Sequence, residues 1–228
     1  MKVSTLLMAA YLELVKASNG IIEDSKIGPL SSTIHKYAIY SAVSASFSLA
    51  PGIGAIVTAL SQTGLVWGTY VAINKELGIS LKENVLKFIG AAMLTNLATN
   101  AGTALIAYLG AAILAFIPLG NLLSVGLMGA IGYILIYASA ILYLKLLTNV
   151  MKAKGNYEMD ESERTKNIIK SVVEGANIKD IIKEGKENFD AANKSGEFKN
   201  ARNNLECPSC GANFKKGQKF CSNCGFKL

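Results

Sequence analysis

Residues 88–144 read FIGAAMLTNLATNAGTALIAYLGAAILAFIPLGNLLSVGLMGAIGYILIYASAILYL, 57 residues without a single Asp, Glu, Lys or Arg. A second uncharged stretch of 38 residues, 37–74, precedes it. A soluble helix needs a polar face, which windows of this length hardly supply. Since a helix needs about 20 apolar residues to cross the hydrocarbon core of a bilayer, each stretch has room for two crossings. The sequence therefore predicts an all-α membrane domain.

Proline and glycine interrupt each uncharged stretch near its middle. Ala50-Pro51-Gly52 divides the first, and residues 117–121 (IPLGN) divide the second. Proline removes a backbone donor and disfavours helix at the residue before it, so both points are expected to be turns. The prediction is two helical hairpins with about four hydrophobic helices, at residues 31–50, 53–74, 85–116 and 122–147.

Lysines mark the helix ends that lie away from the two expected turns. By the positive-inside rule these ends face the cytoplasm, so we expect an integral protein of a prokaryotic inner or plasma membrane with both termini cytoplasmic. The first helix is the weak element, because only 14 residues separate Lys36 from Pro51 and a crossing requires Lys36 to snorkel. Hairpins that dip into the bilayer and return are the alternative. The lysines concerned are Lys26, Lys36, Lys75, Lys82, Lys87, Lys145, Lys152 and Lys154.

The remaining segments are more polar. Residues 1–30 predict an amphipathic helix, on the membrane surface or against the bundle, and a linker. Residues 151–204 form a charged connector with two short amphipathic helices, at 160–175 and 177–189, while 191–204 is expected to be a flexible linker. Residues 31–150 hold the membrane domain, and 205–228 the last domain. The net charge of +7 is interleaved with acids and contains no long basic run, so no nucleic-acid partner is expected.

All four cysteines fall within the last 22 residues, paired as Cys207-x-x-Cys210 and Cys221-x-x-Cys224. Each C-x-x-C turn presents two sulfurs to one ion, and four thiolates complete the tetrahedral coordination that Zn²⁺ prefers. No coordination position is left open, so one structural Zn²⁺ in a small β zinc ribbon is predicted; a redox dithiol pair or an iron site is the alternative. Thiolate ligands favour a reducing compartment, which agrees with a cytoplasmic tail.

This segment resembles a known family of short zinc ribbons. Its pattern is C-P-x-C-G, a polar hairpin, F-C-x-x-C-G and a basic end, and it covers residues 206–228. Such ribbons occur at the ends of many prokaryotic membrane and regulatory proteins. The resemblance implies a module for recognition or assembly.

The hydrophobic part is similar to an uncharacterised bacterial helical-hairpin membrane domain that accompanies Ras-like GTPases. The likeness is carried by residues 50–54 (APGIG), Gln62, the Trp67-Gly68-x-Tyr70 segment, and 117–120 (IPLG) before Gly126. It implies a membrane anchor that works with a nucleotide-dependent partner, a GTPase. The chain itself lacks G-x-x-x-x-G-K-[ST], so no P-loop is expected.

Two groups of residues in the hydrophobic helices are candidates for functional roles, one in helix packing or oligomer formation and one in forming a polar path. Small residues let helices approach closely, so the glycines favour either a homo-oligomer or packing within the same unit. The polar group of the third helix is expected to point inward, where it lines a path for solute or water or forms interhelical hydrogen bonds. The glycines are Gly64, Gly68, Gly126, Gly129 and Gly132, and the polar residues are Thr95, Asn96, Thr99 and Asn100.

No nucleophile–histidine–acid set can be assembled around His35, the only histidine, which is expected at a membrane interface. An enzyme is therefore not expected. The favoured function is a membrane-anchored adaptor or scaffold that presents its cytosolic ribbon to a protein partner. The alternative is an oligomeric channel, pore or membrane-remodelling protein regulated by its tail.

Overall fold

The computed structural model describes residues 4–46, 54–114, 121–153, 159–203, 218 and 220–223, with the backbone alone for 46, 54–62, 100–114, 121–127, 202 and 203. It is mostly helical, with eight α-helices and a short 3-10 turn at Asp24–Lys26. The helices are α1 (Thr5–Ala17), α2 (Ile27–Ser46), α3 (Gly54–Leu77), α4 (Glu83–Leu114), α5 (Asn121–Lys152), α6 (Glu163–Glu174), α7 (Ile178–Lys194) and α8 (Glu197–Asn203).

The four long helices α2 to α5 lie close to the predicted ranges, so the helical fold class is confirmed. The turns expected at 50–52 and 117–120 lie outside the described residues. At the C-terminus of α3, Gly78 adopts a φ of 69°, and the Ile79 N–H donates to the Asn74 carbonyl at 2.9 Å. This bond closes a Schellman turn, which glycine accommodates without steric cost.

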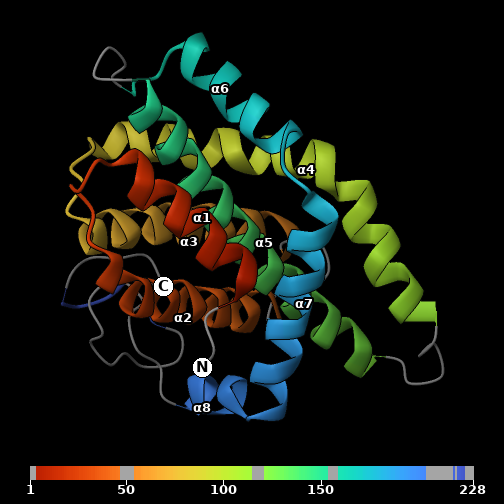
Figure 1. The fold of residues 1–228 in the computed structure, drawn as a ribbon. Coiled ribbons are helices and arrows are strands. Elements are labelled where there is room, and N and C mark those ends of the chain that lie inside the picture. Colours follow the sequence, from red (N-terminus) through yellow and green to blue (C-terminus); the bar gives the residue numbers. More distant parts are fainter. Residues whose placement is uncertain are drawn as a thin grey trace.

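Helix α5 lies at the centre of the bundle, with α1, α2 and α7 packed along it and α3, α4 and α6 completing its surroundings (Figure 1). Among the described residues one helix, Met128–Lys152, is long and apolar enough to cross a membrane, and 83% of its most apolar window is buried. The core helix of a water-soluble bundle has the same properties. The sequence predicted four membrane-spanning helices, whereas the described residues contain one helix with the required length and hydropathy. One such helix is weak evidence for membrane insertion.

The connector helices α6 and α7 belong to the same hydrophobic core as the hairpins. Ile169 and Val173 of α6 and Ile181 of α7 are buried in one cluster with α5. Each helix starts at a side-chain cap: the Ser162 hydroxyl accepts from the Thr165 N–H, and the Asn177 side chain accepts from the Asp180 N–H. The boundary expected at residue 150 therefore crosses one continuous core.

The flexible linker expected at 191–204 is wrong. Helix α7 continues to Lys194, and α8 follows after Gly196, whose φ of 78° permits the sharp change of direction. Phe198 of α8 packs on Phe189 and on Tyr133 of α5. These contacts stabilise a helix whose own sequence is too polar and too short to predict one.

Candidate metal centre and its attachment to the bundle

The described part of the C-terminal segment is residue 218 and residues 220–223, which include the first cysteine of the second C-x-x-C pair. Cys221 is 3% exposed, Ser222 and Asn223 form a turn, and Phe220 makes a β-bridge. The Asn223 N–H points at the Cys221 Sγ across 3.4 Å. The Cys221 sulfur thus lies at the start of a tight backbone turn, and the thiolate is the form of cysteine that binds metal.

The residues present fit zinc. Cys221 is buried in a segment whose sequence offers almost no apolar core, so a metal ion would supply the folding energy. Cys207, Cys210 and Cys224, which lie outside the described residues, would complete a four-thiolate set with Cys221. Such a set would fill all four coordination positions of Zn²⁺. The metal would therefore stabilise the fold without taking part in catalysis.

Residues 203–228 match the family model of a zinc-ribbon domain, and a domain of this kind implies a Zn²⁺ site. The comparison with curated proteins matches nothing, and neither does that with solved structures. The family match begins at residue 203, which is also the last residue of α8. The family match therefore begins at the end of a helix that packs on the bundle.

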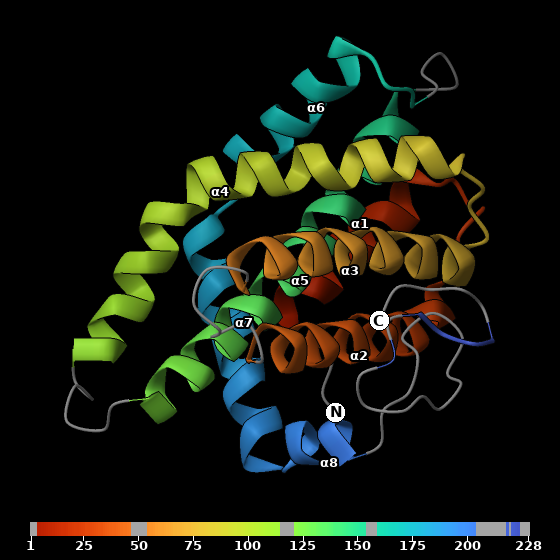
Figure 2. The ribbon, with the colours of Figure 1, turned by 180° about the vertical axis from the view of Figure 1, so that it is seen from behind.

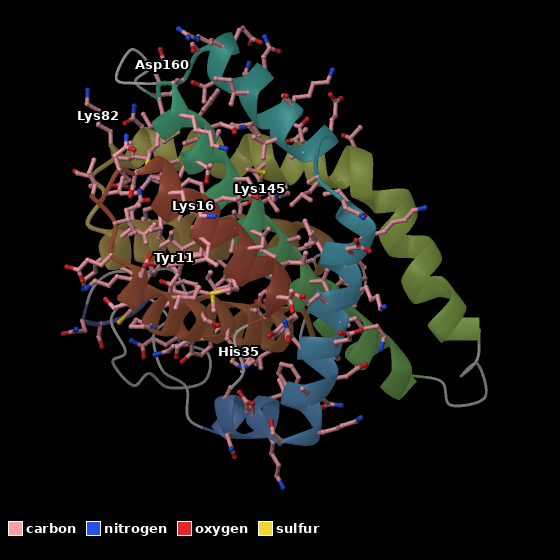
Figure 3. All side chains as sticks on the ribbon, in the orientation of Figure 1. Tyr11, Lys16, His35, Lys82, Lys145 and Asp160 are labelled. Carbon is pink, nitrogen blue, oxygen red and sulfur yellow. The ribbon has the colours of Figure 1, made fainter. Side chains whose placement is uncertain are left out.

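Helix α8 is held to α2 through His35, which Figure 3 labels beside α8. The His35 Nε2 lies 2.7 Å from Glu197 Oε2, and its Nδ1 lies 2.6 Å from the Tyr133 hydroxyl. The Ser195 hydroxyl donates to the other Glu197 oxygen at 2.8 Å. Burial raises the pKa of Glu197, but the hydrogen bonds from His35 and Ser195 outweigh it and hold this pKa below its usual value. His35 was expected at a membrane interface; in the structure it links three helices.

An aromatic cluster lies beside this ion pair. The ring centres of Phe189 and Phe198 are 4.8 Å apart, and Tyr133 meets them edge-on at 5.9 and 6.4 Å. Edge-to-face pairs at these distances each contribute about 0.5–1.5 kcal/mol beyond area burial. No pattern in the sequence paired Tyr133 with Phe189 or Phe198.

The charged connector also ties down the N-terminal helix. The Glu184 carboxylate of α7 accepts from the Leu6 N–H at 3.1 and 3.2 Å and from the Tyr137 hydroxyl, which also meets the Ser4 hydroxyl. A carboxylate at a helix N-terminus satisfies an orphan donor and complements the helix dipole. Glu184 thus joins α1, α5 and α7, a role that no sequence pattern indicated.

The glycines differ in what surrounds them. A Cβ on Gly132 would lie 2.7 Å from the Ser41 carbonyl oxygen, and the Ser41 hydroxyl donates to the Gly132 carbonyl at 2.7 Å. Gly132 therefore serves the contact between α2 and α5 within one chain. Gly64 has open space where a Cβ would stand. Gly68 and Gly129 are buried, and Gly126 lies on α5 where only the backbone is described.

Gly185, which the sequence analysis did not single out, makes a second close helix contact. A Cβ there would lie 3.1 Å from the Tyr137 ring and 3.3 Å from Ile134. The absence of a side chain lets α7 approach α5 closely. A glycine inside a charged amphipathic helix was the signal that could have located this contact.

The two threonines of the polar group in α4 do not face the bundle interior. Thr95 and Thr99 are exposed, and their hydroxyls donate to the carbonyls of Ala91 and Thr95, one turn earlier, at 2.9 Å. Half-buried Asn96 donates to the Ala92 carbonyl at 2.9 Å. The inward orientation expected of this face is therefore wrong for Thr95 and Thr99. Asn100 lies where only the backbone is described.

Proposed function

We propose that this protein is a membrane-anchored adaptor or scaffold that presents a cytosolic zinc ribbon to a protein partner. The observation that carries the proposal is where the zinc-ribbon match begins in the chain. It begins at residue 203, the last residue of α8, and α8 is fixed to α2 and α5 through Glu197, His35, Phe198 and Tyr133. The segment that carries the recognition module therefore leaves the bundle from a helix with a defined position.

The anchor is supported by sequence. The uncharged stretches 37–74 and 88–144 are longer than any core helix requires. The resemblance of this part to a domain that accompanies Ras-like GTPases makes a GTPase the partner class to test first. Homo-oligomer formation through the open face at Gly64 is compatible with the same function.

The channel or pore alternative receives no support from the described residues. That alternative was an oligomer assembled through the glycine faces, with the polar residues of α4 as its supporting feature; Thr95 and Thr99 are exposed, and their hydroxyls bond within their own helix. We therefore retain the adaptor as the proposed function.

The test is proximity labelling in native cells, with the labelling enzyme fused to the C-terminus. Three forms are compared: the natural chain, Cys221→Ser, and the matched control Ser222→Ala, which changes the same turn without removing a thiolate. We expect the natural chain and Ser222→Ala to label one defined set of cytosolic neighbours and Cys221→Ser to lose it, with all three in the membrane fraction. The same neighbours around all three forms would overturn the adaptor function.

A further inference from the structure

A small polar cavity lies where α1, α2, α5 and α7 meet. Its volume is about 20 Å³. One water molecule needs about 10–15 Å³ and about two to four polar partners, so the cavity has room for one. A cavity lined by apolar groups stays dry, whereas most of the residues around this one are polar. The polar lining residues are Ser4, Ser31, His35, Tyr133, Tyr137 and Asn188.

On the α1 side of the cavity, the hydroxyl protons of Tyr137 and Ser4 are already committed. The Tyr137 hydroxyl donates to Glu184, the carboxylate that caps α1 at the Leu6 N–H. The Tyr137 oxygen also meets the Ser4 hydroxyl, and because its single proton goes to Glu184, Ser4 is the donor in this second bond. The Ser4 oxygen keeps lone pairs that can accept a further hydrogen bond.

On the other side of the cavity, the Tyr133 proton is committed to the group that holds α8, which lies beside α2 at one end of the bundle (Figures 1 and 2). Glu197 accepts from the His35 Nε2 at 2.7 Å, so in the neutral imidazole Nδ1 is an acceptor. The Tyr133 hydroxyl therefore donates to this Nδ1 at 2.6 Å. Its oxygen, on a residue only 1% exposed, is left with a lone pair and no proton.

Ser31 of α2 brings a donor to the same cavity. The residue is 4% exposed, and within the part of the chain that the structure describes its hydroxyl bonds to no protein group. Buried hydroxyls are seldom left without a partner. The cavity thus joins a donor that needs an acceptor to the oxygens of Ser4 and Tyr133, which need a donor. A water molecule both donates and accepts, so one water satisfies all three groups.

We infer that this cavity binds one water molecule, which accepts from Ser31, donates to Ser4 and Tyr133, and joins the two groups into one hydrogen-bonded network. The network runs from the start of α1 to α8, at whose last residue the zinc-ribbon match begins. The packing of α1 is thereby coupled to the docking of α8, because groups that share one water cannot change independently. This coupling adds a means of control to the proposed function and does not depend on membrane anchoring.

Hydrogen exchange of the α8 amides in the full-length protein tests the coupling. Tyr137→Phe removes a hydroxyl on the α1 side of the cavity, and Ser31→Ala removes a partner of the water itself. Both should speed exchange in α8 by at least about twofold, the low end of couplings measured within one network. Tyr11→Phe is the matched control, because its hydroxyl donates to the Glu23 carbonyl and does not line the cavity. It should leave exchange in α8 unchanged.

The water itself should be visible in a crystal structure of the full-length protein at a resolution that shows ordered solvent, within hydrogen-bond distance of Ser31 and Tyr133. In a dry cavity Ser31→Ala would instead slow exchange or leave it unchanged, because alanine is the better helix former. An empty cavity, or α8 exchange unchanged by either Tyr137→Phe or Ser31→Ala, overturns the inference. Equal acceleration by Tyr11→Phe overturns it too, since the effect would then be a general loss of stability. Failure of the adaptor function shows only in the labelling comparison.

Discussion

At the scale of single residues, Gly132 lies so close to the backbone of α2 that no side chain fits there. A Cβ in Gly132→Ala would approach the Ser41 carbonyl to 2.7 Å and Ala45 to 3.0 Å, so α2 and α5 must separate. We expect a loss of about 1–3 kcal/mol in the free energy of unfolding. Denaturant unfolding in mild detergent, followed by helical circular dichroism, measures it.

Gly64→Ala is the matched control for this substitution. Nothing lies within 4 Å of its Cβ position, and alanine is favoured over glycine in a helix by about 1 kcal/mol. We expect unchanged or slightly raised stability. If Gly132→Ala left stability unchanged while Gly64→Ala lowered it, the α2–α5 contact described here would be incorrect.

Cys221 carries a separate prediction about metal content. The natural chain should hold one Zn²⁺, and Cys221→Ser should hold none or bind it far more weakly, because a three-thiolate set lacks the fourth ligand. Elemental analysis of the purified protein decides this, with Ser222→Ala expected to match the natural chain. Iron in the natural protein, or zinc retained by Cys221→Ser, would contradict the site.

At the scale of elements, the docking of α8 should depend on pH through Glu197. Its pKa is lowered in the folded protein, so the stabilisation is fully present above the ordinary glutamate value of about 4.3 and is lost as pH falls through the folded value. Because the Glu197 side chain is 41% exposed, the effect is less than about 1 kcal/mol. Glu197→Gln should therefore weaken α8 docking at neutral pH.

Hydrogen exchange of the α8 amides measures this docking. The difference between Glu197→Gln and the natural chain should be present at pH 6–7, decline below about pH 4 and vanish once Glu197 is protonated in both states. Exposed Glu187 of α7 supplies the control, and Glu187→Gln should leave exchange in α8 unchanged. A difference that persisted undiminished below about pH 3 would show that the Glu197 carboxylate does not hold α8.

At the scale of the whole molecule, α6 and α7 should be needed for the hairpins to fold. Removing everything after residue 153 uncovers Ile134 and Tyr137 and takes away the Glu184 carboxylate that caps α1. We expect the chain 1–153 to lose cooperative unfolding and to aggregate, whereas 1–203 keeps a cooperative transition. Equal transitions for both chains would mean that residues 1–153 form an independent domain.

Local features of the sequence were sufficient for helices α1 to α7 and for the metal-binding cysteines. The 3.6-residue pattern and the caps at Ser162 and Asn177 locate α6 and α7, and the paired C-x-x-C turns define the zinc ribbon that the family match confirms. Helix α8 was missed, because its stability comes from Phe189, Tyr133 and His35, which are distant in sequence or on other helices.

The amino-acid sequence by itself determined that the chain is helical, that its charge is confined to particular segments, and that it ends in a zinc ribbon, because periodicity, proline breaks and ligand spacing are local properties. Only the tertiary structure decided that the charged connector packs on α5, that His35 and Glu197 hold α8, and that Gly132 serves an internal contact. These contacts depend on which helix faces pack against one another after folding. A single helix pattern cannot distinguish lipid from another helix as the cover of an apolar face.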